Sequence, residues 1–224
     1  MKQTFSPVWN KDAKIFNNAD YLPSDLRMII CGPAGCGKTC LLQRMLLEDG
    51  ILDYNKLYIY TPTINQIGYQ ILIKGFKNNL SKEMIRNVYI NQNEITDLDQ
   101  ALELVKNKIT RKNPVIEVFP FANREDLILP EELDKKSRNL CIFDDCCFDK
   151  EPIVENYFTR GRHSNINMIY LTQSFFELPK RSIRNNSNQL VFSMQGPTDI
   201  QNIWQHLCKE DFPVLKYFKE ACQN

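Results

Sequence analysis

Residues 32–39 read Gly-Pro-Ala-Gly-Cys-Gly-Lys-Thr, which fits the pattern G-x-x-x-x-G-K-[ST]. An apolar run at 27–31 precedes this stretch, and residues 38–48 after it place leucines and a methionine at helical spacing until Gly50. Strand, glycine-rich turn and helix in this order form a phosphate-binding loop, or P-loop. Three of the eight glycines of the chain lie in this stretch, whereas a simple turn needs one or two.

The chemistry of a P-loop follows from its backbone. Glycines let successive N–H groups face one anion, and the dipole of the following helix adds to the attraction. We expect Lys38 to reach the β- and γ-phosphates of ATP and the Thr39 hydroxyl to ligate Mg²⁺. The predicted cofactors are therefore ATP and Mg²⁺. The residues predicted to contact the nucleotide are Gly32, Pro33, Ala34, Gly35, Cys36, Gly37, Lys38, Thr39 and Cys40.

The composition is that of an average globular protein. The chain has 224 residues, of which 43% are hydrophobic and 25% are charged, so a fibrous or wholly disordered protein is excluded. Its net charge of +1 provides no global attraction to nucleic acid or membrane. Any site for a polyanion must therefore be a local patch.

The eight cysteines form no C-x-x-C pair, and only two histidines could complete a metal shell, which argues against a zinc site. The polar first residues lack the apolar core of a signal peptide, and no uncharged apolar run approaches the roughly 18 residues of a membrane span. We expect an intracellular protein with free thiols and no membrane partner.

Further apolar runs lie at 57–60, 140–143, 168–171 and 189–193, and residues 97–108 predict a helix with Asp97 as its N-cap. Nearly continuous apolar strands are typical of a parallel sheet that is buried on both faces. The sequence thus predicts an α/β fold, a mostly parallel central sheet covered by helices on both faces.

The expected domain organisation is simple. Residues 1–25 are predicted to form an N-terminal arm and residues 26–224 a single P-loop ATPase domain. Prolines and charges at 109–138 predict a surface excursion from that domain, and residues 199–221 predict one or two closing helices.

Two carboxylates follow the apolar run Leu140–Phe143, as in a Walker B element. We predict that Asp144 holds Mg²⁺, directly or through water, and that Asp145 faces the attacking water as the general base. The aspartate side chain is one methylene shorter than the glutamate that most such ATPases place here. A solvated strand end that caps the next helix is the alternative interpretation.

An amide and a basic run follow later in the chain. Gln173 follows the apolar run 168–171, where it could sense the γ-phosphate or orient water. The alternative is that the polar residues after this strand mark where the chain reaches solvent. Residues 160–184 contain five basic residues and only one acidic residue, Glu177. Arginines in such a patch suit DNA phosphates or the γ-phosphate of a neighbouring subunit, and a solvated charged face is the alternative. The five basic residues are Arg160, Arg162, Lys180, Arg181 and Arg184.

The segments GPAGCGKT, CIFDDC, FTRGRHSNINMIYLTQSFFELPK and IRNNSN together resemble the poxvirus-type DNA-packaging ATPases of large eukaryotic DNA viruses, virophages and Polinton-like elements. These belong to the FtsK/HerA superfamily, and the likeness spans roughly residues 25 to 195. It implies an ASCE-type, RecA-like sheet in which the Gln173 strand lies between the P-loop strand and the Asp144 strand. It also implies that Gln173 is the sensor glutamine and that an arginine of TRGRH, either Arg160 or Arg162, is a trans-acting finger.

The same resemblance implies a homo-oligomeric ring, a hexamer or a pentamer, that pumps double-stranded DNA of any sequence into a preformed capsid. The capsid vertex or portal protein would be a partner, and the host-cell site of virion assembly or the virion itself would be the location.

Two other functions are compatible with the P-loop alone, a nucleoside or small-molecule kinase and a nucleotide-gated portal scaffold that hydrolyses little ATP. A GTPase is disfavoured because the sequence contains no N-K-x-D tetrapeptide. We favour Arg162 over Arg160 as the finger because Gly161 leaves the chain free to aim its neighbour, whereas Arg160 closes a predicted helix.

Overall fold

The computed structural model describes residues 16–107, 115–144, 152–193 and 196–222. Its centre is a six-stranded sheet in which every neighbouring pair of strands is parallel, in the order β3-β2-β4-β5-β1-β6. The strands are β1 (Arg27–Cys31), β2 (Lys56–Tyr60), β3 (Glu117–Phe121), β4 (Asn139–Asp144), β5 (Ile166–Thr172) and β6 (Gln189–Phe192). The predicted α/β class and parallel sheet are confirmed, and β5 lies between β1 and β4 as the resemblance implies.

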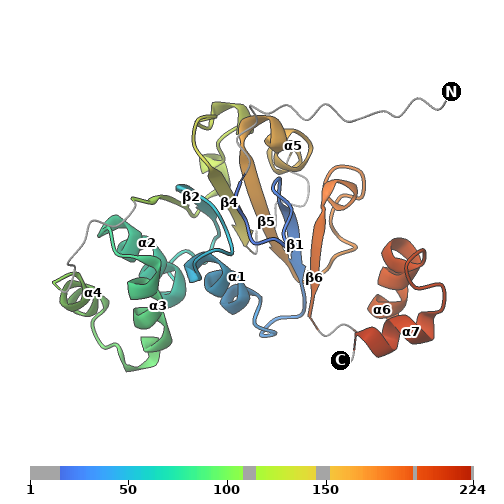
Figure 1. Cartoon of the computed structure of the whole chain (residues 1–224), viewed down its shortest axis with the longest axis horizontal. Helices are drawn as coiled ribbons and strands as arrows, with labels where there is room; N and C mark the ends of the chain where they lie inside the picture. Colours follow the sequence, from blue (N-terminus) through green and yellow to red (C-terminus); the bar gives the residue numbers. More distant parts are fainter. Residues whose placement is uncertain (1–15, 108–114, 145–151, 194–195, 223–224) are drawn as a thin grey trace.

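Helices cover both faces of the sheet. Figure 1 shows α1 to α4 on one side and α5 on the other, with α6 and α7 beyond β6. The helices are α1 (Lys38–Leu47), α2 (Ile67–Lys77), α3 (Lys82–Ile90), α4 (Leu98–Lys106), α5 (Pro152–Arg160), α6 (Pro197–Ile203) and α7 (Leu215–Ala221). Short turns are η1 (Gln92–Glu94), η2 (Arg124–Asp126), η3 (Pro130–Glu132), η4 (Gly161–Ser164), η5 (Arg184–Asn186) and the π-turn η6 (Trp204–Cys208).

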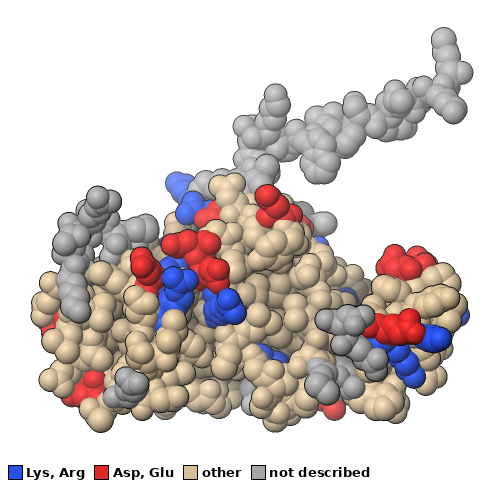
Figure 2. All heavy atoms as spheres, turned by 60° about the horizontal axis from the view of Figure 1, so that its bottom comes forward, with Lys and Arg blue, Asp and Glu red and all other residues tan. Residues whose placement is uncertain are grey.

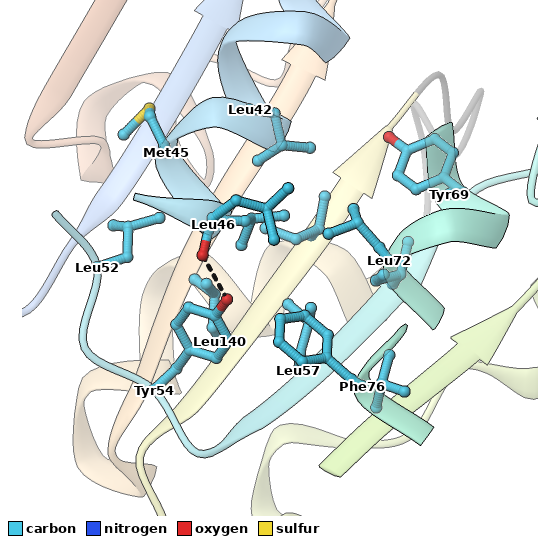
Figure 3. Packing of buried hydrophobic residues seen from close by; sticks show 14 of the residues in the cluster. Leu42, Met45, Leu46, Leu52, Tyr54, Leu57, Tyr69, Leu72, Phe76 and Leu140 are labelled. Atoms are coloured by element: carbon cyan, nitrogen blue, oxygen red, sulfur yellow. Dashed lines mark hydrogen bonds between the residues drawn. The ribbon is translucent and has the colours of Figure 1, made fainter. Parts of the chain in front are cut away.

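The side of the sheet facing α1 to α4 is packed mainly with leucine and isoleucine, and we call this the aliphatic core. Figure 3 shows its centre, where Leu42 and Leu46 of α1 meet strand residues such as Leu57 and Leu140. Buried side chains on one face of a helix and on alternate positions of each strand produce this arrangement. The packing holds α1, and with it the P-loop, against the sheet.

The opposite side is rich in rings, and we call it the aromatic core. The rings of Tyr60 and Phe143, from neighbouring strands, stack at a centroid distance of 5.2 Å. Tyr157 of α5 meets Phe143 edge-on at the same distance. These offset and edge-to-face arrangements are the favoured geometries of aromatic pairs. They fix α5 on this face of the sheet.

The prediction that 109–138 forms a surface excursion is wrong for one segment, because β3 (Glu117–Phe121) pairs with β2 as an edge strand of the sheet. Pro120 is one of the prolines on which the prediction of a surface excursion in place of a strand rests. A proline is tolerated in β3 because this strand forms the edge of the sheet, where one side of the backbone pairs with no other strand of the described residues. Residues 108–114 of this stretch lie outside the described residues.

No element is assigned from the sequence between residues 62 and 96, and the structure places α2 and α3 there. The predicted helix at 97–108 is confirmed as α4, and the Asp97 carboxylate accepts hydrogen bonds from the backbone N–H groups of Asp99 and Gln100 at 2.9 and 3.1 Å. The closing helices are α6 and α7. Between them, the ring of His206 in η6 lies 5.8 Å from that of Phe176, so η6 contacts the segment after β5.

The first described residues of the arm contribute to the core, since Phe16 and Leu22 are buried. Among the described residues, no helix is both long and apolar enough to cross a membrane.

Candidate nucleotide-binding site

The P-loop connects β1 to α1 and depends on its glycines. Gly35 and Gly37 have φ angles of 75° and 91°, in the left-handed region that favours glycine. A Cβ atom on Gly32 would lie 2.6 Å from both Cys36 Sγ and Ser193 Cβ, so no larger residue fits without displacing its neighbours. The loop therefore needs glycine at three positions, two for their backbone conformation and one for lack of space.

The amino terminus of α1 is prepared for an anion. Gly37 is its N-cap and has no side chain to bond the first N–H groups, and no acidic residue lies in the first turn. These donors and the helix dipole point toward whatever occupies the loop. A phosphate group satisfies both.

Lys38 places its ammonium group at the same point. Its Nζ donates to the carbonyl oxygens of Gly32 and Pro33, at 2.7 and 3.0 Å, and so lies over the loop itself. A phosphate oxygen bound in the loop would lie within reach of this charge. Cys31, at the end of β1, adds no negative charge nearby, because burial raises the pKa of its thiol to about 11.

Oxygen ligands for a divalent cation meet beside the loop. The Thr39 hydroxyl donates to Asp144 Oδ2 at 3.3 Å, and the buried phenol of Tyr69 donates to the same oxygen. Asp144 is 6% exposed. A hydroxyl and a carboxylate next to a phosphate-binding loop are the hard oxygen ligands that Mg²⁺ takes in nucleotide sites. The donor set thus fits the predicted metal.

These groups line one cavity of about 240 Å³ at the carboxyl end of the sheet. Asp144 at the end of β4 and Gln173 directly after β5 both line this cavity. Its other lining residues come mainly from the P-loop and from the connection before α2. Ligands bind at this end of open parallel sheets, where neighbouring connections diverge. The lining residues are Ala34, Gly35, Lys38, Thr39, Thr63, Gln66, Asp144, Leu171, Thr172 and Gln173.

The sequence reasoning missed Thr63, Gln66 and Tyr69, which come from the connection after β2 and from α2. The Thr61 and Thr63 hydroxyls lie 2.9 Å apart, and the Thr63 N–H donates to Thr61 Oγ1 at 3.2 Å, which shapes this connection. The available signal was the polar run T-P-T-I-N-Q directly after an apolar strand, the same signal that identified Gln173.

Among the other predicted site residues, Asp145 lies outside the described residues. Cys36 and Cys40 do not line the cavity, and both thiols are free. Arg160 ends α5 and pairs with Glu131 at 3.6 Å. Arg162 lies in η4, directly before β5 begins, and its predicted role stays a prediction.

The turn η4 lies at the amino end of β5, whereas the cavity lies at its carboxyl end. A strand of seven residues at about 3.3 Å per residue separates the two by roughly 20 Å. The structure therefore does not bring Arg160 or Arg162 to the cavity of the same chain.

The rest of the basic run, Lys180, Arg181 and Arg184, follows the Gln173 connection. Lys180 and Arg181 are exposed, but the Arg184 guanidinium lies 5.5 and 5.3 Å from the rings of Phe175 and Phe176. Arg184 is thus held by cation–π contacts. On the face drawn in Figure 2, basic and acidic side chains lie next to one another and form no field of one sign.

Comparison of the fold with solved structures finds the genome packaging NTPase B204 from Sulfolobus turreted icosahedral virus 2. Its complex with AMP has a TM-score of 0.51 at 13% identity, and the match covers 87% of each chain. Its complex with ATP-gammaS has a TM-score of 0.50 at 14% identity, over 83% of this chain and 84% of that chain. At such identities the likeness shows the fold, that of a P-loop NTPase.

No curated protein sequence matches the chain significantly. The family model described as Poxvirus A32 protein matches residues 13–210, most of the sequence. With its P-loop, its sheet order and this match, the chain belongs to the Poxvirus A32 protein family, whose members are viral genome-packaging NTPases.

Proposed function

We propose that this protein is an ATP-driven motor that translocates double-stranded DNA into a viral capsid. The observation that carries the proposal is the cavity in which the P-loop, Asp144 and Gln173 meet, in a chain of the Poxvirus A32 protein family. One side of this cavity suits phosphates and the other suits a metal ion and a water molecule.

In the proposed cycle, the N–H groups of the P-loop and Lys38 bind the phosphates of ATP. Thr39 and Asp144 would hold Mg²⁺, which would neutralise charge on the bound phosphates. The Gln173 amide, at the edge of the same cavity, contacts the γ-phosphate or orients the attacking water. Asp145, the next residue after β4, accepts the proton of that water.

We expect the arginine that stabilises the transferred phosphate group to come from a second subunit. Because η4 lies roughly 20 Å from the cavity of its own chain, an arginine there can act only on the ATP of a neighbour. An arginine that acts in trans requires neighbouring copies of the chain, as in the ring of five or six subunits that the resemblance implies, with Arg162, or Arg160 as the second choice, completing each site. Arg160 already pairs with Glu131, which favours Arg162.

Contacts to DNA are proposed for Lys180 and Arg181, which are exposed on the connection that follows Gln173. A translocating motor must bind phosphates and not base edges, since it moves along any sequence. A link between the sensor amide and the DNA-binding side chains within one connection would couple hydrolysis to movement. The capsid vertex or portal protein is the proposed partner at the end of the DNA path.

The test is ATP hydrolysis, measured as released phosphate, with and without duplex DNA. We expect duplex DNA of any sequence to stimulate turnover and physiological salt to weaken the stimulation relative to low salt, as the release of counterions requires. Two unrelated duplexes of equal length serve as the matched comparison.

If the rate of ATP turnover is the same with and without DNA but requires a small phosphate acceptor, the protein is a kinase instead. Nucleotide binding with no turnover in either condition would identify a scaffold. A strong preference for one of the two duplexes would count against translocation.

A further inference from the structure

We propose that Tyr69 is a positioning residue for the metal site: its buried phenol holds the Asp144 carboxylate in the orientation that binds Mg²⁺ together with Thr39. The inference rests on the proposed function, because it takes Thr39 and Asp144 as the groups that hold the metal. It adds a residue from α2, a helix that the P-loop and the Walker B strand do not include.

The geometry places three side chains at one oxygen atom. The Tyr69 hydroxyl and the Thr39 hydroxyl both donate to Asp144 Oδ2, the latter at 3.3 Å. They come from α2, α1 and β4, so the contact joins the helix behind the P-loop, the strand end and a third element. The Tyr69 side chain is 0% exposed, which fixes where its hydroxyl can be.

A carboxylate on a short side chain needs such a contact. The terminal torsion of an aspartate has a broad energy profile, so its own rotamer preference does not fix which oxygen faces a ligand. A donor on a completely packed ring does fix it, since the ring cannot follow the carboxylate as it turns. A hydrogen bond to the ionised form also favours the charge that a metal ligand needs.

The aliphatic core does not require a hydroxyl at this position. A phenylalanine would fill the same space, whereas a buried hydroxyl is tolerated only when it is hydrogen-bonded. Figure 3 shows the Tyr69 hydroxyl at the edge of the cluster, far from the hydroxyl of Tyr54. Tyr54, 5% exposed, donates instead to the backbone carbonyl of Leu46, at 2.7 Å.

The two tyrosines make a matched pair for experiment. Substitution by phenylalanine removes from each the hydroxyl that makes the hydrogen bond described above, and both lie in the same core. Only Tyr69→Phe removes a contact to a proposed metal ligand. A purely structural role would make the two variants behave alike.

The measurement is the dissociation constant of a fluorescent ATP analogue, determined for each variant in saturating Mg²⁺ and in EDTA. The constant in EDTA divided by the constant in Mg²⁺ reports how strongly the metal and the nucleotide support each other in the site. Removal of a hydrogen bond to a metal ligand weakens metal binding by about 10- to 100-fold, so this ratio should fall by about 10-fold in Tyr69→Phe. The constant in EDTA should not change.

Tyr54→Phe should retain the wild-type ratio, and thermal unfolding of both variants should show similar small losses of stability. The inference is overturned if the Tyr69→Phe ratio equals that of wild type, if it rises, or if Tyr54→Phe lowers the ratio as much. A wild-type protein whose nucleotide affinity is the same with and without Mg²⁺ would overturn the metal site itself, and with it this role.

Discussion

The two faces of the sheet differ in chemistry and in what they support. The aliphatic core packs α1 and α2 against the strands and so holds the P-loop and Tyr69. The aromatic core packs α5 and the connection after β5, which lead to η4 and to the basic side chains. Consecutive strand residues point to opposite faces, so a single sheet separates the binding of ATP from the groups proposed to contact DNA and a neighbouring subunit.

This separation has a mechanical consequence. Ile142 and Phe143 are adjacent in β4, yet the first belongs to the aliphatic core and the second to the aromatic core. Asp144 follows both at the cavity. A shift of this strand would reach both faces at once, because packed interiors transmit displacements and do not absorb them.

The largest effect is expected for Lys38→Ala, which disables the side of the sheet that binds ATP and leaves the other intact. Turnover should fall below detection, because the charge that meets the β- and γ-phosphates is lost. DNA binding without nucleotide, measured by fluorescence anisotropy, should be unchanged. The control is Lys74→Ala, which removes a lysine of α2 that pairs with Asp99 of α4 and should keep normal turnover. Wild-type turnover in Lys38→Ala would refute the P-loop assignment.

The next effect concerns the opposite face. Arg162→Ala should bind ATP normally and hydrolyse it about 10³- to 10⁵-fold more slowly, the usual contribution of a trans-acting arginine. Mixing it with Lys38→Ala should restore part of the activity, since an intact P-loop on one subunit can meet an intact Arg162 on the next. Each parent alone must stay inactive.

Arg160→Ala is the matched control for this experiment. This variant should retain most of the wild-type turnover, because Arg160 is the last residue of α5 and its side chain pairs with Glu131. A mixture that remains inactive while rings still form would assign the finger to another arginine.

A stability measurement compares the two cores directly at adjacent residues. Ile142→Val should cost about 1 kcal/mol of unfolding free energy, as expected for one methylene in a packed core. Phe143→Leu should cost more, about 2 to 3 kcal/mol, because its ring contacts Tyr60, Tyr157 and Tyr170 and each aromatic pair adds about 0.5 to 1.5 kcal/mol. Urea unfolding measures both. Equal losses would mean that the ring geometry contributes nothing specific.

The smallest effect is expected in the salt dependence of DNA binding. Lys180→Ala and Arg181→Ala should each lower the slope of log affinity against log salt by about 0.9, the contribution of one phosphate contact, with ATP binding unchanged. Lys106→Ala, at the end of α4 on the other face of the sheet, is the control. Slopes that match wild type in both variants would place the DNA contacts elsewhere.

The sequence by itself determined the parts of this protein that are local in the chain. All residues of the P-loop lie within eight consecutive positions, where backbone sterics and the capping of one helix decide the conformation. Every strand except β3, together with α1 and α4, followed from hydrophobic periodicity and capping, and Asp144 and Gln173 followed from their places after apolar strands. The family resemblance added the position of β5 between β1 and β4, which no local pattern contains.

The tertiary structure alone decided what arrives at the cavity from elsewhere. Thr63, Gln66 and Tyr69 belong to no recognised motif. Tyr69 of α2 reaches Asp144, and the connection before α2 brings Thr63 and Gln66 to the cavity, because the apolar side of α2 packs on the strands. Pro120 lies in a strand because β3 is at the edge of the sheet, and strand order is invisible to local patterns. The physical reason is common to these cases: contacts between residues distant in the chain depend on how whole elements bury their apolar faces together.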